Sequence, residues 1–186
     1  MSFWIETYTG LAFSIVDPRP DDVRLVDIAH ALSNTCRYNG HCKRFYSVAE
    51  HSVHLARFIR YRIYNTRAVA LAALLHDAAE AYTGDFPTPF KWALPELKYI
   101  ENAIQQAVHD HYCIKPEDYK VQVIDDLDKR IVKDERKALM TESGLPWGAI
   151  DGLEPLDINI ECWKPEIAED RFLATFHMLA CEEKAT

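Results

Sequence analysis

The sequence predicts an all-α fold, a single helical bundle with a short β-hairpin-like segment at its N-terminal end. Apolar residues recur at helical spacing along most of the chain, and prolines and glycines separate these stretches. Strand-like character is confined to the first residues. The chain has 186 residues, the size of one domain with its own hydrophobic core. We therefore expect residues 1–186 to form a single domain.

The N-terminal segment WIETYTGLAFSIVDPRP has strand character, with Gly10 as the expected hairpin turn. In the next run, DDVRLVDIAHAL, apolar residues at helical spacing predict a helix over residues 22–34. The stretch that follows, NTCRYNGHCKRFY, mixes Asn, Gly, cationic and aromatic residues without periodicity. We expect it to be a loop.

A capping signal marks the start of the second helix. Ser47 can accept a hydrogen bond from the backbone of the first turn, and Glu50, three residues later, can reach back to complete a capping box. His51 then lies in the first turn or just beyond it. A third helix is predicted over residues 66–82, where Ala, Leu and Val dominate as far as His76, so this helix must be buried on most sides.

Apolar stripes predict three further helices, over residues 94–112, 117–141 and 165–181. Pro165 suits the first turn of the last one. The connection before it contains four turn-forming residues: Gly144, Pro146, Gly148 and Gly152. A loop of this length is uncommon in a compact domain, and we expect it to wrap over a site or over another subunit.

Charge and cysteine content narrow the functional classes. The 21 basic and 29 acidic residues give a formal net charge of −8, so we expect no nucleic-acid partner and no membrane partner. The five cysteines are odd in number and form no C-x-x-C pair, which is typical of a reducing cytoplasm. The sequence contains no apolar run that could span a bilayer and no secretory signal. A cytoplasmic protein is therefore expected.

His76 and Asp77 stand side by side in the third predicted helix and need partners, because an unpaired buried charge is costly. A His-Asp pair by itself is more often an ordinary structural feature. A second pair, in HDHY, has nothing around it in the sequence that suggests a site. Around the first pair, however, His51 begins the preceding helix, and Asp125 and Asp128 lie one turn apart on a later one. Two imidazoles and two carboxylates can hold one divalent ion and leave positions open for water and substrate.

Other hydrolase and zinc motifs do not fit the sequence. A zinc peptidase requires H-E-x-x-H, whereas the chain has EHSVH, with the wrong order and spacing. The phosphate-binding motif G-x-x-x-x-G-K-[ST] does not occur. The cysteines also lack the spacing of a structural zinc module.

Three stretches, SVAEH, LLHDAAEAYTGDFPTPFK and DLDKRIVKDERKAL, together resemble the motif set of the HD-domain phosphohydrolases. The resemblance is closest to the small nucleotide-cleaving branch, which includes bacterial 5'-deoxynucleotidases and phage dATP triphosphohydrolases, and it runs from YTG at residues 8–10 through most of the chain. It implies an HD-type helical bundle. By the same resemblance, the metal ligands are His51, His76, Asp77 and Asp128, with Asp125 competing for the last position.

Further roles follow from the resemblance. Glu80 matches the carboxylate that orients or deprotonates the attacking water, and Asp85 matches a second acid for proton transfer near the scissile phosphate. Arg37 and Lys91 match positions that contact phosphate. For Tyr38 and His41 two interpretations stay open: contact with the base or sugar, and ordinary loop packing.

The chemistry requires a divalent transition metal, for which Zn, Co and Mn are all suited to the ligands. Mg could accompany a nucleoside triphosphate. The stretches YTG, DIAHALS, CRYNGH and FYSVAEHS resemble the phage group, so the main expectation is a dATP-preferring triphosphohydrolase that releases deoxynucleoside and triphosphate. The alternatives are a 5'-deoxynucleotidase acting on deoxynucleoside monophosphates and a non-catalytic nucleotide-binding protein. The small-molecule partner is in each case a nucleotide, and a homo-oligomer is expected.

Overall fold

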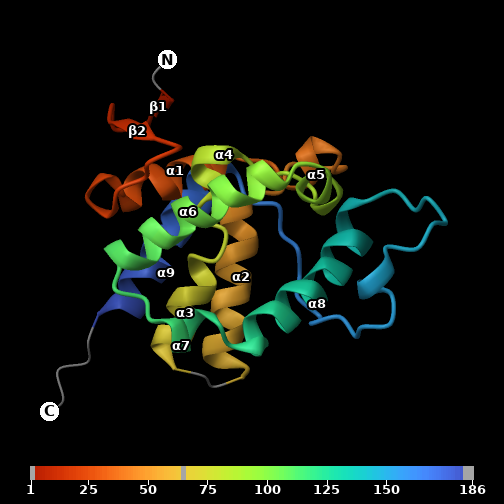
Figure 1. Cartoon of the computed structure of the whole chain (residues 1–186). Helices are drawn as coiled ribbons and strands as arrows, with labels where there is room; N and C mark the ends of the chain where they lie inside the picture. Colours follow the sequence, from red (N-terminus) through yellow and green to blue (C-terminus); the bar gives the residue numbers. More distant parts are fainter. Residues whose placement is uncertain (1–2, 64–65, 182–186) are drawn as a thin grey trace, which may run out of the picture.

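The computed structural model describes residues 3–63 and 66–181. The chain begins with a two-stranded antiparallel sheet of β1 (Trp4–Glu6) and β2 (Ala12–Ser14), in which Ile5 lies opposite Phe13. Gly10 lies in the turn between them with a φ of +77°, a conformation that favours glycine. The predicted hairpin is therefore present, and Figure 1 shows it at one edge of the helices.

The rest of the described chain is mainly helical, as predicted. The longer helices are α1 (Leu25–Asn34), α2 (Val48–Tyr61), α3 (Arg67–Leu74), α6 (Pro95–His111), α8 (Gln122–Leu139) and α9 (Pro165–Ala180). The shorter ones are α4 (Glu80–Thr83), α5 (Thr88–Ala93) and α7 (Pro116–Tyr119). Three turns of 3-10 helix connect them: η1 (Pro20–Asp22), η2 (Arg37–Gly40) and η3 (Gly148–Ile150).

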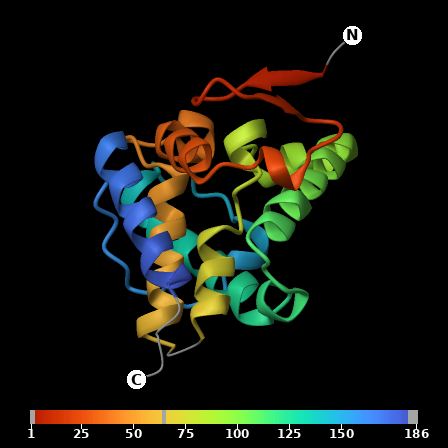
Figure 2. The same cartoon turned by 90° about the vertical axis from the view of Figure 1, so that its left-hand side faces the viewer.

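Helix α2 lies at the centre of the bundle. It packs against α1, α3, α8 and α9, and Figures 1 and 2 show it enclosed by these elements. Its inward side chains, among them Val53, Leu55 and Ile59, have no exposed surface. Their removal from water is a main stabilising contribution, of about 1.5–3 kcal/mol for each large side chain. The buried position of α2 makes it a rigid support for polar groups near its N-terminal end.

The start of α2 confirms one half of the predicted capping box and corrects the other. The Ser47 side chain accepts a hydrogen bond from the Glu50 backbone N–H at 3.1 Å. The Glu50 carboxylate instead accepts three backbone N–H groups, from Glu161, Cys162 and Trp163, at 2.6–3.0 Å. These groups belong to the connection before α9, and the pairing satisfies donors that folding would otherwise leave without a partner.

The prediction of one continuous helix over residues 66–82 is wrong. Helix α3 ends at Leu74, Leu75 leaves the helical region with φ −102° and ψ 9°, and α4 begins only at Glu80. Hydrogen bonds of the tighter i→i+3 type span the interval, from Ala78 to Leu75 and from Glu80 to Asp77. His76 and Asp77 therefore lie on a turn between two helices.

Three other boundaries differ from the prediction. The helix expected over residues 22–34 begins at Leu25, after the separate turn η1. The helix expected over residues 117–141 is divided into α7 and α8, which are separated at residues 120–121. Residues 88–93, expected to be part of a proline-containing break, form the short helix α5. The helices predicted over 94–112 and 165–181 are present within one or two residues.

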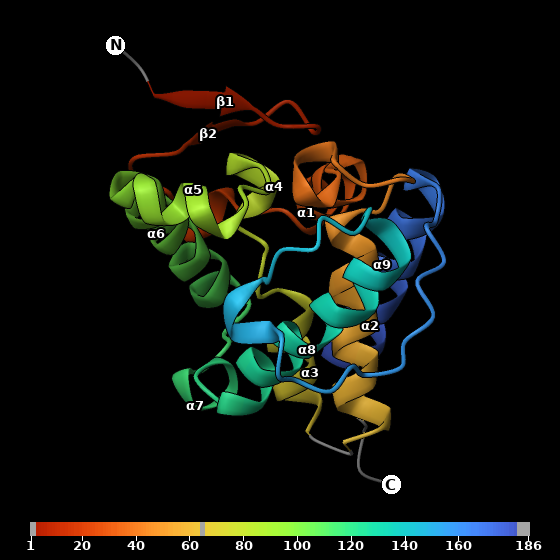
Figure 3. The ribbon, with the colours of Figure 1, turned by 90° about the vertical axis from the view of Figure 1, so that its right-hand side faces the viewer.

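The connection between α8 and α9 returns along the outside of the bundle (Figure 3). Its Asp151 and Leu156 backbones are held by side chains of α8, with Lys133 Nζ donating to the Asp151 carbonyl at 2.8 Å and Asp134 accepting from the Leu156 N–H at 2.9 Å. Among the helices of the described residues, none combines the length and apolar character needed to cross a bilayer.

Candidate metal centre and active site

Three side chains, one from α2 and two from the turn after α3, converge beside the first turns of α2. His51 has no exposed surface, and its Nε2 lies 3.4 Å from Nε2 of His76, in the turn after α3. The Oδ2 atom of Asp77 lies 3.1 Å from His76 Nε2 and 3.8 Å from His51 Nε2. These three residues form a donor cluster that could hold a metal ion.

Helix α8 adds a second carboxylate to the cluster. Asp128 Oδ1 lies 3.1 Å from His51 Nε2 and 3.8 Å from His76 Nε2. Asp125, one turn earlier on the same helix, is exposed. The structure therefore places Asp128, the preferred of the two sequence candidates, beside the imidazoles.

The distances from each imidazole to the carboxylates are close to those expected around one divalent ion, and His51, His76 and Asp77 form the group whose donor atoms all lie within 4.8 Å of one another. Ligand atoms held at ~2.1 Å from a common ion lie about 3–3.4 Å from one another. Here His51 Nε2 lies 3.1–3.8 Å from His76 Nε2 and the nearest oxygens of Asp77 and Asp128. His76 Nε2 lies 3.1–3.8 Å from His51 Nε2 and the same two oxygens. Two imidazole nitrogens and two carboxylate oxygens suit Zn, Co or Mn. The chain's own residues thus fit the metal dependence that the sequence predicts, and the choice of metal stays a prediction.

Both imidazoles are held in the orientation that metal binding requires. Nδ1 of His76 lies 2.8 Å from the carbonyl oxygen of Ala73, and Nδ1 of His51 lies 2.7 Å from Oε1 of Glu135. When each ring is neutral, the acceptor at Nδ1 takes its proton, and the lone pair of each Nε2 then faces the cluster.

The cluster stabilises positive charge. Burial alone would lower the pKa of His76, but the carboxylates of Asp77 and Asp128 raise it well above its ordinary value. Burial opposes the ionisation of Asp77 and Asp128, yet the two histidines lower the pKa of both carboxyls. A divalent ion supplies the same positive charge in place of protons.

Glu80, at the start of α4, combines burial with one unpaired oxygen. Its side chain is 5% exposed, Oε1 accepts from Nζ of Lys91 at 2.9 Å, and Oε2 is buried without a hydrogen-bond partner among the described residues. Burial and the nearby Asp77 and Asp85 raise the pKa of Glu80 well above its ordinary value, against the effect of Lys91. A carboxyl group with these properties suits proton transfer to or from water.

Asp85 connects the end of α4 to the loop that contains η2. It follows Gly84, whose φ of +86° turns the chain away from α4, and its Oδ2 accepts the backbone N–H of Tyr38 at 3.1 Å. Burial raises the pKa of Asp85. This second acid therefore lies beside the predicted substrate-binding loop.

The predicted substrate-binding residues of η2 differ in their placement. Arg37 is 8% exposed, and its Nη1 lies 3.7 Å from Oδ2 of Asp77. The Tyr38 hydroxyl donates to Glu135, which also pairs with Arg37. His41 is exposed at the end of η2. Arg37 and Tyr38 thus adjoin the metal cluster, whereas His41 lies at its periphery.

The connection between α8 and α9 contacts η2, and whether it covers a site or another subunit stays a prediction. The Trp147 ring lies 5.9 Å from the Tyr38 ring, measured between centroids. The guanidinium carbon of Arg136, on α8, lies 4.6 Å from the centroid of Trp147. Aromatic and cationic contacts therefore hold this part of the connection beside the predicted substrate-binding loop.

Comparison with known proteins decides the family. The family model described as 5'-deoxynucleotidase YfbR-like matches residues 32–141, the part of the chain that contains every residue of the cluster. The chain belongs to the YfbR-like 5'-deoxynucleotidase family. This YfbR-like protein is therefore a phosphohydrolase of the HD type, as its motifs predict.

The chain is similar to several individual relatives over different lengths. Protein YfdR of Escherichia coli (strain K12), a protein described as uncharacterized, is 33% identical over 181 residues, which is 97% of each chain. An uncharacterized protein of Rhodobacter capsulatus is 39% identical over 111 residues, 57% of this chain and 56% of its own. A 5'-deoxynucleotidase of Yersinia pestis (strain Pestoides F) is 32% identical over 133 residues, 59% of this chain and 61% of its own.

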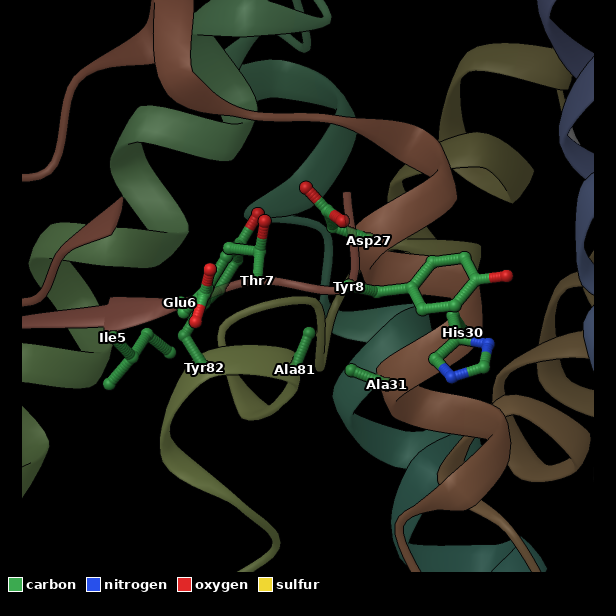
Figure 4. A pocket seen from close by; sticks show the side chains of 9 residues that line it. All are labelled: Ile5, Glu6, Thr7, Tyr8, Asp27, His30, Ala31, Ala81 and Tyr82. Atoms are coloured by element: carbon green, nitrogen blue, oxygen red, sulfur yellow. The ribbon is translucent and has the colours of Figure 1, made fainter. Parts of the chain in front are cut away.

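Two of the pockets formed by the described residues lie away from the buried imidazoles. One, of about 350 Å³, is lined by Asp85 together with Thr35, Asn39 and Phe86. The other, of about 290 Å³, lies between the N-terminal hairpin, α1 and α4, and Figure 4 shows the side chains of Tyr8 and His30 on one side of it. The pocket beside Asp85 is the one that connects with the predicted site.

The structure also brings in a residue to which the sequence assigned no role of its own. Glu135 has no exposed surface and contacts His51, Arg37 and Tyr38. Burial alone would raise its pKa, but Arg37 and His51 lower the pKa of Glu135 to about 2. Its position seven residues after Asp128, two turns along the same helix face, was the available signal in the sequence.

Proposed function

We propose that this YfbR-like protein is a metal-dependent 5'-deoxynucleotidase that converts deoxynucleoside monophosphates into deoxynucleosides and inorganic phosphate. The observation that carries the proposal is the convergence of His51, His76, Asp77 and Asp128 next to a carboxyl oxygen of Glu80 that has no hydrogen-bond partner among the described residues. The family model and the named Yersinia relative support the monophosphate as substrate.

In this proposal the four cluster residues hold the metal, and the bound ion supplies Lewis acidity and neutralises phosphoryl oxygens. Arg37 contacts the phosphate with the part of its guanidinium that faces Asp77. The substrate-binding set is Arg37, Tyr38, His41 and Lys91. The nucleoside would extend toward the pocket beside Asp85, which has space for a sugar and a base.

The proton transfers are assigned to the two buried acids. Glu80 accepts a proton from the attacking water, whose oxygen forms the new bond to phosphorus. Asp85 donates a proton to the 5' oxygen as the bond between phosphorus and that oxygen breaks. The raised pKa of each group suits these roles, because efficient proton transfer requires acids and bases with pKa values near the working pH.

The triphosphohydrolase expectation has less support. A triphosphate carries more negative charge than a monophosphate and requires more cations that are free to contact it. Both predicted phosphate-contacting cations already have acidic partners: Lys91 lies 2.9 Å from Glu80 and 3.2 Å from Glu101, and Arg37 pairs with Glu135. The Yersinia relatives carry the name 5'-deoxynucleotidase. A Mg ion accompanying a triphosphate is therefore not part of this proposal.

Product analysis tests the proposal directly. The full chain is stripped of metal, reloaded with Zn, Co or Mn, and supplied separately with the four deoxynucleoside monophosphates and the four deoxynucleoside triphosphates. We expect inorganic phosphate and deoxynucleoside from the monophosphates. Triphosphate released from dATP would support the other hydrolase, and nucleotide binding without turnover under every metal would support a regulatory protein. The expected homo-oligomer also stays a prediction, which the mass in solution tests.

A further inference from the structure

Glu135 lies where α8 passes between the metal cluster and η2. Its Oε1 lies 2.7 Å from Nδ1 of His51, and its Oε2 lies 3.2 Å from Nε and 3.1 Å from Nη2 of Arg37. The hydroxyl of Tyr38 donates to the same Oε2. We propose that Glu135 is a positioning residue that fixes both a metal ligand, His51, and the phosphate-contacting Arg37. The inference rests on the proposed function and assigns to Glu135 a role in building that site.

The first step of the argument concerns His51. A neutral imidazole has one nitrogen that donates and one that accepts, and the partner of Nδ1 decides which is which. Because the Glu135 carboxylate can only accept, it holds the proton on Nδ1 and keeps the Nε2 lone pair directed at Asp128 and His76. A carboxylate in this position also increases the basicity of the metal-binding nitrogen.

The second step concerns Arg37, a buried cation that requires an anion to offset its desolvation. Glu135 occupies the edge of the guanidinium formed by Nε and Nη2. The remaining amino group, Nη1, is the one that lies 3.7 Å from Asp77, toward the cluster. The contact with Glu135 therefore determines which edge of Arg37 faces the phosphate position.

Both steps require a charged carboxylate with two accepting oxygens. In Glu135→Gln one of these oxygens is replaced by an amide NH₂, which donates. The amide NH₂ would face another donor, which is either the Nδ1–H of His51 or the N–H groups of Arg37 and the hydroxyl of Tyr38. One of the two sides then loses its acceptor, although the side chain keeps nearly the same volume.

The neighbouring Asp134 provides a matched control on the same helix. It is 9% exposed and accepts the backbone N–H of Leu156 at 2.9 Å, in the connection between α8 and α9. Asp134→Asn therefore removes a buried carboxylate from the same helix without removing a contact to His51 or Arg37. Any general effect of losing a buried charge from α8 appears in both variants.

The experiment measures the Co²⁺ dissociation constant of the full chain by competition with a chelator, together with KM and kcat for a deoxynucleoside monophosphate. We expect Glu135→Gln to weaken Co²⁺ binding about 10- to 100-fold and to raise KM. Asp134→Asn should keep the wild-type metal affinity. Thermal unfolding in excess chelator identifies a variant whose affinity changes only because its fold is lost.

A measurement on the wild-type protein covers the case in which Glu135→Gln does not fold. Nitrogen-15 NMR of the Zn-loaded chain should show the proton of His51 on Nδ1 and the metal on Nε2, and the opposite arrangement would overturn the inference. Unchanged Co²⁺ affinity and KM in a folded Glu135→Gln would also overturn the inference. The proposed function would stand in that case, because the wild-type chain would still bind the metal. If the wild-type chain binds none of Co²⁺, Zn²⁺ and Mn²⁺, the proposed function fails and the inference fails with it.

Discussion

The imidazole Nδ1 of His76 lies 2.8 Å from the carbonyl oxygen of Ala73, three residues earlier in the chain. This contact occupies one of the carbonyl groups left unpaired where α3 ends, and it directs Nε2 of the same ring toward His51. The histidine therefore helps to end the helix and presents a metal-binding nitrogen in the same conformation.

The fourth metal ligand can be tested by a pair of substitutions on α8. Asp128→Asn should reduce the metal retained after dialysis, because it weakens an oxygen donor 3.1 Å from His51 Nε2. Asp125→Asn should retain wild-type metal, because Asp125 is exposed. The metal content of both variants is measured after loading with Zn. The reverse order of retention would remove Asp128 from the ligand set.

Glu80→Gln should separate catalysis from metal binding. The amide cannot accept a proton from water, so we expect kcat to fall about 100- to 10,000-fold, while metal content stays at the wild-type level. The exposed Glu142 offers a control, and Glu142→Gln should leave both quantities unchanged. Full turnover by Glu80→Gln would show that another group handles the proton of the water.

Glu50→Ala should destabilise the fold without touching the site chemistry. The variant leaves the N–H groups of Glu161, Cys162 and Trp163 without their acceptor. Each such loss costs about 1–3 kcal/mol when the group stays buried. We expect a loss of a few kcal/mol in the free energy of unfolding, measured with urea, against little change for Glu142→Ala. Equal stability of the two variants would show that water replaces the carboxylate.

His109 should make the fold sensitive to acid outside the metal site. Its side chain is 6% exposed, and burial lowers its pKa. The unfolded chain therefore binds a proton at a pH where the folded protein does not, so the free energy of unfolding should fall as pH decreases through about 6.5 toward the lower folded pKa. Urea unfolding in chelator at several pH values should give a shallower fall for His109→Gln.

The control for this pH dependence is His111→Gln, which removes an exposed imidazole from the same helix. This variant should keep the wild-type slope, because the buried imidazole that stacks on Tyr119 at 4.0 Å stays in place. Equal slopes for wild type and His109→Gln would assign the acid sensitivity to other groups.

Much of this architecture could be predicted from the sequence because the responsible forces are local. The apolar spacing within α6 and α9, the Ser47 cap of α2 and the turn at Gly10 depend on residues a few positions apart. The motif stretches likewise indicated the HD-type family and the residues of the cluster. Metal-binding chemistry limits the useful side chains to a few types, so the sequence alone indicates which residues group together.

Periodicity was insufficient where local and distant contacts compete. Residues 75–79 are apolar enough to continue α3, yet the chain leaves the helix there, and His76 and Asp77 reach the side chains of α2 and α8. Glu50 had a suitable local partner in the capping box but pairs instead with backbone groups more than a hundred residues away. Sequence spacing indicates the nearby hydrogen-bond partner and not the more favourable partner that is distant in the sequence.

The helical class, the family and the side chains available for a metal follow from the sequence alone. Tertiary packing places Asp128 and not Asp125 beside the imidazoles, brings Arg37 to the cluster, and links Arg37 to His51 through Glu135, which lies 84 positions from His51. The physical reason is that a hydrogen bond depends on distance and direction in space. Those quantities are fixed only when α2, α8 and the loop containing η2 are packed together.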